Sequence, residues 1–476
     1  MKRLAFIGFI LMTVASWAQE RTTIHIEHAN QMQKKRGSEA VVLKGDVYIR
    51  HENTHFYCDS AYYYEGRYAE FFHNVRMMDD STLLETEYLT YDRNLHLACY
   101  PNHGVTTRGD KQLVSEKGYY RDDLKEFRFF RDVVAASPKY KMLTDTLYYN
   151  TRVEKMWFQG PTTIIHEENT LEGKHGYYLT ERELAYLDKD PVMYNETQTM
   201  TADSLLYDRQ NGFAKAMNHI EMIDTSYKVV LRGQYAELWE KIGYSFATDS
   251  AYAMYYDDPD TLFVASDTMF YHFKTQLNNE EKILGRRHVR FYKSNMQGQC
   301  DTMIYDMADS TIRMRVNPVL WTDDTQMTGD RIDIRIAHHA IDSLFQRGDA
   351  FIISKDTVEG FNQINGADMV SKFIEGGIDH VNVKGDAKVI SWLREDDASL
   401  IGINKSSAKR MRILMKDKSI SLIKYYETIN ETLYPEDELK ESDRFLNGFI
   451  WREEERPKEW KDIFSRPVSS FPHNDQ

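Results

Sequence analysis

EFFHNVRMMDDSTLLETEYLTYD, residues 70–92, contains one unit of a pattern that recurs along most of the chain. An acidic residue, Glu87, is followed four positions later by a tyrosine, Tyr91, and the same spacing returns about 29 residues away on both sides. Repeats with a period of about 20 to 50 residues indicate a fold of stacked supersecondary units. The repeat therefore predicts a fold of stacked units.

Two sequence markers keep the same period. The first is the acidic residue with its tyrosine, at Asp59/Tyr63, Glu87/Tyr91, Glu116/Tyr120, Asp145/Tyr149, Asp203/Tyr207, Asp267/Tyr271 and Asp301/Tyr305, with degenerate copies at Gly173, Gln234, Asp330 and Asp368. The second is a β-branched residue that follows a turn residue, at Val47, Val75, Val105, Val133, Thr162, Val192, Ile220, Val289 and Val319. Agreement of the two markers indicates a true internal repeat of about eleven units.

Each unit has room for two strands of about ten residues and for no helix between them. Phe71, His73, Val75 and Met77 fall on one face of such a strand, and Arg76 and its even-numbered neighbours fall on the other. Stacked units of this kind bury an apolar interior that one unit could not bury alone. The prediction is an all-β protein, an elongated β-jelly roll or solenoid of stacked repeats of about 29 residues.

The recurring acidic residue is expected at a corner, where a short polar side chain can bond backbone amides as the strand bends. A residue repeated in nearly every unit is architectural, and a row of catalytic aspartates is disfavoured. The tyrosines are expected as a stacked row, with rings against the sheet and hydroxyls near water.

The two ends of the sequence differ from the repeats between them. Residues 1–18 combine Lys2 and Arg3 with an apolar run and small residues, which is typical of a cleaved signal peptide. A repeat domain is expected over residues 19–395, and capping strands with a charged tail over 396–476. Whether the tail forms a short helix or a loose segment stays open.

The net charge of the chain, −14, disfavours nucleic acid as a partner.

The three cysteines form no disulfide framework in a chain of this length. Cys58 and Cys99 could form a disulfide, but packed free thiols are favoured for these and for Cys300.

The segment from His51 to His55 fits the His-Glu-x-x-His pattern of zinc peptidases. This pattern can bind zinc only on a helix, where the two histidines share a face. Its aromatic and β-branched flanks predict strand, turn and strand instead. We therefore expect no metal there, and no cofactor elsewhere.

The signal peptide, strands such as Gly45-Asp46-Val47 and Gly385-Asp386-Ala387, and the recurring Asp-Ser/Thr-x-x-Tyr-Asp units together resemble the OstA-like family of organic solvent tolerance and lipopolysaccharide-transport proteins, over roughly residues 38–395. The resemblance implies a periplasmic jelly roll, open along one seam, that shields lipopolysaccharide acyl chains and catalyses no reaction. It also implies edge-strand pairing with other transport proteins or with further copies, and association with the outer membrane. The chain departs from the family in its length and in its C-terminal region.

Inward positions of the second marker would line the lipid groove. They are Val47, Ile49, Phe71, Val75, Met77, Ile220, Met222, Val289 and Phe291. For each of them, an ordinary dry core is the alternative interpretation.

Two other functions stay open. A secreted polysaccharide-active β-helix enzyme would need a pair of carboxylates as acid and base, for which Asp79 with Asp80 or Asp257 with Asp258 are the candidates. A structural surface repeat protein would favour units that are nearly identical, whereas these units have diverged.

Overall fold

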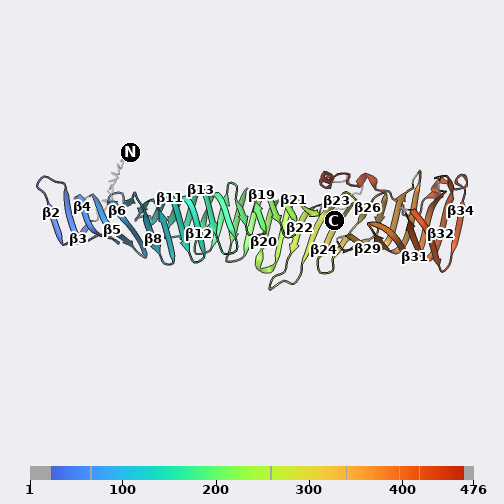
Figure 1. Cartoon of the computed structure of the whole chain (residues 1–476), viewed down its shortest axis with the longest axis horizontal. Helices are drawn as coiled ribbons and strands as arrows, with labels where there is room; N and C mark the ends of the chain where they lie inside the picture. Colours follow the sequence, from blue (N-terminus) through green and yellow to red (C-terminus); the bar gives the residue numbers. More distant parts are fainter. Residues whose placement is uncertain are drawn as a thin grey trace, which may run out of the picture. The chain divides into compact units, whose positions relative to one another are not determined.

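The computed structural model describes residues 23–64, 67–257, 260–338, 340–356, 358–395, 397–416 and 419–465. Within these ranges the chain forms 34 β-strands, five short 3-10 helices and no α-helix (Figure 1). The strands belong to one hydrogen-bonded sheet. The all-β prediction is confirmed. The expected signal peptide, residues 1–18, lies outside the described residues.

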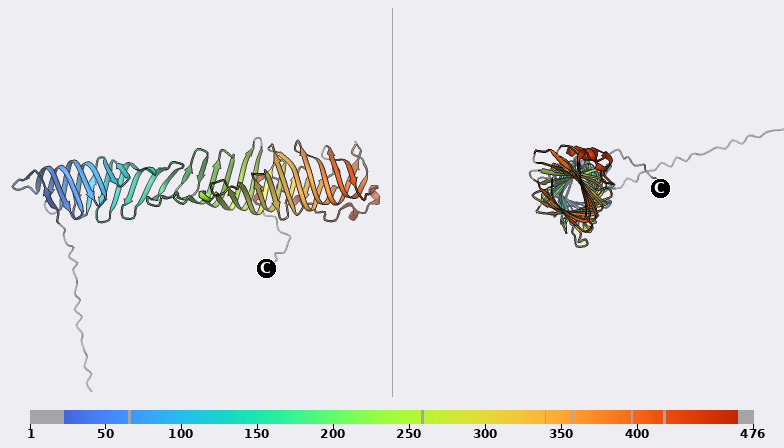
Figure 2. Two further views of the ribbon diagram at one scale, coloured as in Figure 1. Left: turned by 90° about the horizontal axis from the view of Figure 1, so that it is seen from below. Right: turned by 90° about the vertical axis from the view of Figure 1, so that its right-hand side faces the viewer.

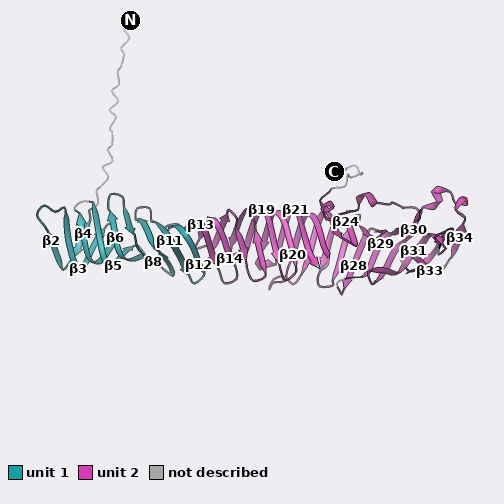
Figure 3. Cartoon of the chain, turned by 45° about the horizontal axis from the view of Figure 1, so that its top comes forward, with its two compact units in different colours: residues 1–160 teal, residues 161–476 magenta. Residues whose placement is uncertain are grey.

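The chain divides into two compact units, residues 1–160 and 161–476, which Figure 3 shows in teal and magenta. The strands of unit 1 are β1 (His25–His28), β2 (Gln31–Lys34), β3 (Ala40–His51), β4 (Thr54–Tyr64), β5 (Tyr68–Asp79), β6 (Thr82–Asp92), β7 (Leu97–Tyr100), β8 (Gly104–Arg108), β9 (Lys111–Ser115), β10 (Lys117–Arg121), β11 (Glu126–Ser137) and β12 (Tyr140–Asn150). The boundary falls within β13 (Lys155–Ile165).

Unit 2 continues the same hairpin pattern. Its strands are β14 (Thr170–Leu179), β15 (Leu184–Asp188), β16 (Val192–Tyr194), β17 (Gln198–Thr201), β18 (Ser204–Asp208), β19 (Phe213–Asp224), β20 (Val229–Trp239), β21 (Tyr244–Asp257), β22 (Asp260–His272), β23 (Lys282–Lys293), β24 (Met296–Asp306), β25 (Thr311–Arg315), β26 (Val319–Thr322), β27 (Thr325–Thr328), β28 (Arg331–Ala337), β29 (Ala340–Lys355), β30 (Phe361–Ile374), β31 (Gly377–Arg394), β32 (Leu400–Lys416), β33 (Ser419–Tyr426) and β34 (Asn430–Tyr434). Its 3-10 helices are η1 (Glu240–Ile242), η2 (Glu436–Glu438), η3 (Glu441–Arg444), η4 (Glu453–Glu455) and η5 (Trp460–Phe464).

Most long strands bend once, at a corner made by two consecutive residues with positive φ. In β5 these residues are His73 (φ 61°) and Asn74 (φ 51°). The register with β6 shifts between Phe72 and Val75, so that two residues of β5 oppose the single residue Glu87. This arrangement is a β-bulge, which bends a strand and increases its twist. Each long strand therefore contributes to two walls, one on either side of its corner.

The corner recurs with the period of the sequence repeat. The pairs with positive φ include Gly45/Asp46, His73/Asn74, Arg131/Asp132, Lys189/Asp190, Asn218/His219, Asp249/Ser250, Arg287/His288, Val316/Asn317, Gly348/Asp349 and Gly385/Asp386. They directly precede marker residues such as Val47, Val75, Val133 and Val289. The second marker is thus the sequence signal of a β-bulge.

The acidic residue of the first marker lies opposite these pairs. Asp59, Glu87, Asp145, Asp267 and Asp301 are the single residues that oppose a pair on the neighbouring strand. The predicted corner position is confirmed.

The carboxylates pair with side chains of a neighbouring corner, whereas we expected backbone amides. Asn74 donates to Asp59 at 2.8 Å. The Nδ1 atom of His219 lies 3.0 Å from Asp203.

In most repeats the residue before the acid closes the corner through its own side chain, whereas Ala202, before Asp203, has no group that could. The hydroxyls of Ser115 and Ser266 donate to the carbonyl two residues onward, at 3.1 and 3.0 Å. The thiols of Cys58 and Cys300 occupy the same position and make the same contact, at 3.1 and 3.3 Å. These two cysteines and Cys99 are free thiols. Burial raises the pKa of Cys58 to about 11 and that of Cys300 to about 12.

After β34 the chain turns back along unit 2 as a strap, residues 435–465, which contains η2 to η5 (Figures 1 and 2). Apolar side chains of the strap are buried against strands of the same unit. This core cluster contains Leu439 and Leu446 of the strap with Phe351, Ile353, Ile390, Trp392 and Ile403 of the sheet. The segment whose form the sequence left open is therefore packed on the sheet in short 3-10 turns.

Buried glutamines of the sheet hold the backbone of the strap. Gln363 accepts a hydrogen bond from the Leu446 N–H at 2.8 Å and donates to the Arg444 carbonyl at 2.8 Å. Gln326 accepts from the Arg452 N–H at 2.7 Å and donates to the carbonyl two residues earlier at 2.8 Å. Each side-chain amide thus forms the paired bonds of a β-bridge.

No helix in the described part of the chain combines the length and the apolar character required to cross a membrane.

The corner can be tested with Asn74→Val. This change should lower the free energy of unfolding by about 1–2 kcal/mol, because a β-branched residue is strained at positive φ and Asp59 loses a donor. Urea unfolding followed by circular dichroism measures it. Met78→Val, at an exposed position of the same strand, is the control and should change stability by less than about 0.5 kcal/mol. Equal losses for the two variants would contradict the corner's role.

The attachment of the strap can be tested with Gln363→Leu. The change leaves the Leu446 N–H and the Arg444 carbonyl without their partner, so hydrogen exchange over residues 436–450 should become about tenfold faster or more. Gln346→Leu is the matched control, since Gln346 is equally buried but donates to strand carbonyls of Thr328 and Phe351. Its effect should be confined to the strands, and faster exchange of the strap in both variants would argue against a specific glutamine contact.

Candidate functional site: the apolar interior and its seam

The first wall of unit 1 is made by the strand halves that contain residues 47–51, 54–58 and 75–79 and their successors. One row of inward side chains can be followed across this wall by strand register: Ile49, Phe56, Met77, Leu84, Thr106, Leu113, Ala135 and Met142. All eight are at most 1 % exposed. The wall therefore presents a nearly continuous apolar surface to the interior.

The second wall is made by the halves that contain residues 40–44, 60–64 and 68–72 and their successors. Leu43, Ala61, Phe71 and Leu89 form its inward row. The ring of Phe71 stacks on the ring of Phe56 in the first wall, with centroids 4.8 Å apart. The two walls thus face each other and are in contact.

The expected lining residues of unit 1 all point into this interior. Val47, Ile49, Phe71, Val75 and Met77 are fully buried. Their side chains are therefore closed off from solvent between the walls.

In unit 2 the residues expected to line the lipid groove differ in burial. Ile220, Val289 and Phe291 are buried, whereas Met222 is half-buried near the end of β19. Phe291 lies directly over Gly298, where an added Cβ would come within 2.3 Å of the ring. Contact between Phe291 and the neighbouring strand therefore requires glycine at this position.

The two walls of unit 1 meet along a seam opposite the corner. On one side lie the first-wall turns at residues 52–53, 80–81 and 109–110, and on the other lie the second-wall turns at 93–96, 122–125 and 151–154. Side chains connect the two sides in three clusters, which we call latches. Each latch contains a carboxylate and a buried tyrosine of the repeat, Tyr91, Tyr120 or Tyr149.

The Asp79 latch joins the turn after β5 to the turn after β10. Tyr120 donates to Asp79, and the Lys125 ammonium lies 2.6 Å from the same carboxylate. Burial opposes the charge on Lys125 most strongly, but the bonds and negative charges of Asp79 and Asp80 together outweigh it and raise the lysine pKa. The side chain of Asp79 is fully buried and that of Lys125 is 20 % exposed, so the carboxylate end of this ion pair is shielded from water.

The Glu154 latch repeats this arrangement farther along unit 1. Tyr149 donates to Glu154 at 2.5 Å, and Arg108 and Lys111 lie 2.9 and 3.1 Å from it. Burial would raise the pKa of Glu154, but these three donors lower it. The carboxylate is therefore held ionised between the two walls.

The Asp122 latch contains histidines. Tyr91 donates to Asp122 at 2.7 Å and lies 2.6 Å from His51 Nδ1. His96 Nδ1 lies 2.8 Å from the other carboxylate oxygen, and Thr54 donates to Asp122 at 3.4 Å. Burial lowers the pKa of His51, which keeps its imidazole neutral.

The His-Glu-x-x-His segment is a hairpin, as predicted. β3 ends at His51, β4 begins at Thr54, and these two residues are register partners. His55 pairs with Arg50 in the next register position and therefore faces the other side of the sheet, where it bonds Tyr48 at 2.9 Å. The structure does not bring His51 and His55 together.

The expectation that the tyrosine hydroxyls lie near water is wrong for the latches. Tyr91, Tyr120 and Tyr149 are at most 2 % exposed, and burial next to a carboxylate raises the pKa of each of them. The sequence placed these tyrosines correctly in one row. It did not identify their partners. Asp122 and Asp79 lie 31 and 41 residues from Tyr91 and Tyr120, in other repeats, whereas Glu154 lies only five residues after Tyr149.

Asp79 and Asp80 do not form an acid and base pair across a cleft. Asp79 belongs to the latch, while Asp80 is exposed and lies 3.2 Å from the same Lys125. For the other candidate pair, the side chains of Asp257 and Asp258 lie outside the described residues.

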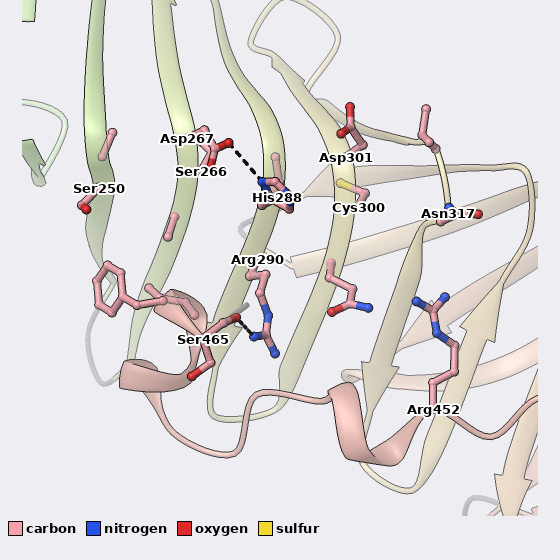
Figure 4. A pocket seen from close by; sticks show the side chains of 17 residues that line it. Ser250, Ser266, Asp267, His288, Arg290, Cys300, Asp301, Asn317, Arg452 and Ser465 are labelled. Carbon is pink, nitrogen blue, oxygen red and sulfur yellow. Dashed lines mark hydrogen bonds and ion pairs between the residues drawn. The ribbon is translucent and has the colours of Figure 1, made fainter. Parts of the chain in front are cut away.

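In unit 2 the strap closes over the strands and leaves a pocket of about 360 Å³ at its end (Figure 4). Arg290, which is 6 % exposed, donates to the backbone carbonyls of Glu455 and Ser465. Burial lowers the pKa of Arg290, against the opposing charges of Asp462 and Glu455. On the other side of the pocket, His288 pairs with Asp267 at 3.0 Å. The end of the strap is therefore anchored by a buried guanidinium.

The chain is similar to a protein family and to several solved structures. LptH, the LptA-homologous periplasmic component of the lipopolysaccharide transport device of Pseudomonas aeruginosa, aligns with 29 % of this chain and 95 % of its own, at 13 % identity and a TM-score of 0.24. No curated protein matches the chain. The model of the family described as OstA-like protein matches residues 21–67 and 63–145. The resemblance to the OstA-like family is thereby confirmed over residues 21–145, the part of the chain that contains most of unit 1.

Proposed function

We propose that this chain is a lipopolysaccharide transport or assembly protein that shields lipid acyl chains between its apolar walls and catalyses no reaction. The observation that carries the proposal is a pair of facing apolar walls whose seam is held by side chains. Backbone bonds at the seam run along the second wall, from Asp122 to His96 and from Thr151 to Lys125. The walls can therefore part without breaking a β-ladder.

The free energy gained by burying an acyl chain favours separation of the walls around it. Each methylene removed from water contributes about 0.8 kcal/mol, so an acyl chain of about 12 methylenes gains roughly 10 kcal/mol. Opening a latch frees both partners together, so it costs less than the ~3–5 kcal/mol of leaving one charge buried alone. Wall residues such as Val75 and Met77 would exchange contacts with each other for contacts with the lipid and would stay out of water.

Placement in the periplasm, with association to the outer membrane, belongs to the same proposal. So does edge-strand pairing with other transport proteins or with further copies. The terminal strands have the exposed apolar side chains that such pairing would cover: Met32 in β2 is 61 % exposed, Leu422 in β33 is 48 % exposed and Leu433 in β34 is 50 % exposed. Unpaired strand edges are templates for added strands.

Lipid contact can be tested with photo-crosslinking side chains placed one at a time in the full chain. Probes at the inward positions Val75 and Ile220 should label lipopolysaccharide at least fivefold more strongly than probes at the outward neighbours Arg76 and Glu221. Mass spectrometry of the adducts measures the yield. Equal labelling at inward and outward positions would overturn the proposed groove.

The seam can be tested with Lys125→Met. Loss of the ammonium leaves Asp79 buried without its cation, so stability should fall by about 3 kcal/mol, and lipid labelling from Val75 should become faster. Arg128→Met is the matched control, because Arg128 pairs with Glu126 at 2.9 Å on an exposed surface of β11. If labelling from Val75 is unchanged in Lys125→Met while stability falls, lipid does not enter through this seam.

A further inference from the structure

The Asp122 latch differs from the other two in its basic groups. Asp79 is paired with Lys125, and Glu154 with Arg108 and Lys111. Among the described residues, the basic side chain paired with Asp122 is that of His96. The place that holds a permanent positive charge in the other latches is thus occupied by imidazoles.

The ligand atoms of this latch lie close together. One atom each from His51, His96 and Asp122 lies within 4.8 Å of the others. The three residues come from different turns: His51 ends β3, His96 follows β6 and Asp122 follows β10. His51 is fully buried and Asp122 is 8 % exposed, whereas the His96 side chain is 27 % exposed and gives access from solvent.

The hydrogen bonds determine which nitrogen of His51 carries the proton. Tyr91 donates its hydroxyl proton to Asp122, so its oxygen must accept from His51 Nδ1, 2.6 Å away. Nδ1 is then protonated, and Nε2 carries a lone pair. A neutral imidazole with one nitrogen fixed as a donor is the form in which histidine binds metals, and the fixing partner acts as an outer-shell ligand.

We propose that His51, His96 and Asp122 form a binding site for a divalent transition metal, with zinc as the ion that this ligand set fits best. Two imidazoles and a carboxylate are usual zinc ligands, and water can complete the tetrahedron. Ligand atoms of such a site are about 3.3 Å apart, so no pair must approach by more than about 1.5 Å. The ion would connect a first-wall turn to two second-wall turns, where Lys125 and Arg108 make the corresponding connection in the other latches.

The test uses the full chain, freed of metal with a chelator and titrated with ZnCl2. Calorimetry and metal analysis should find one zinc per chain at this site, and zinc should raise the thermal midpoint. His96→Gln should weaken binding about tenfold or more and remove the thermal shift. A glutamine amide can still donate to Asp122, so this variant retains the hydrogen bond while losing the ligand.

His55→Gln is the matched control, because His55 lies in the same hairpin and faces away from the site. It should bind zinc as the wild type does. Visible absorption of bound Co2+ in the wild-type chain reports nitrogen and oxygen coordination without any substitution. Absence of zinc and cobalt binding in the wild type, or equal zinc binding by His96→Gln, would show that the cluster is a hydrogen-bonded latch only.

Discussion

The structure depends on a corner at which two residues with positive φ oppose one acidic residue. Without it, a strand of twelve residues such as β5 would continue in one sheet, and its inward side chains would face solvent. With it, each strand turns between two walls, and every unit repeats the turn in register with the last. Residues with positive φ are costly outside glycine, yet they recur here in pairs such as His73 and Asn74. The contact with Asp59, and the side-chain bonds made by residues before the acid such as Ser115 and Cys58, offset that strain.

Closure of the interior is chemically different in the two units. In unit 1 the seam is held by three clusters that each contain a buried tyrosine and a carboxylate. In unit 2 a segment of the chain's own C-terminus lies on the strands and is held by glutamine amides and by Arg290. Side-chain clusters can be broken singly, whereas the strap makes contacts with many strands that must be lost together. The proposed entry of lipid is for this reason assigned to the latched seam of unit 1.

Much of the fold could be predicted from the sequence because the corner has a local signature. The turn residues before Val47, Val75 and Val289, and the acids Asp59, Glu87 and Asp301, are defined by neighbours in the chain. The latches could not be predicted in this way, because Asp79 and Lys125 lie in turns of different repeats and the residue types change from latch to latch. The sequence also contains a signal for the strap. Gln326 and Gln363 stand at inward positions of apolar strands, where a buried amide requires a partner.

The position before the acid also explains the state of two of the three cysteines. Cys58 and Cys300 stand where other repeats have serine or threonine, and their sulfur atoms take over the contact of a hydroxyl oxygen. Because burial keeps these thiols protonated, they are poor nucleophiles and react slowly with oxidants or other thiols. A chain with an odd number of cysteines can thereby pass through an oxidising compartment without forming mixed disulfides at these two positions.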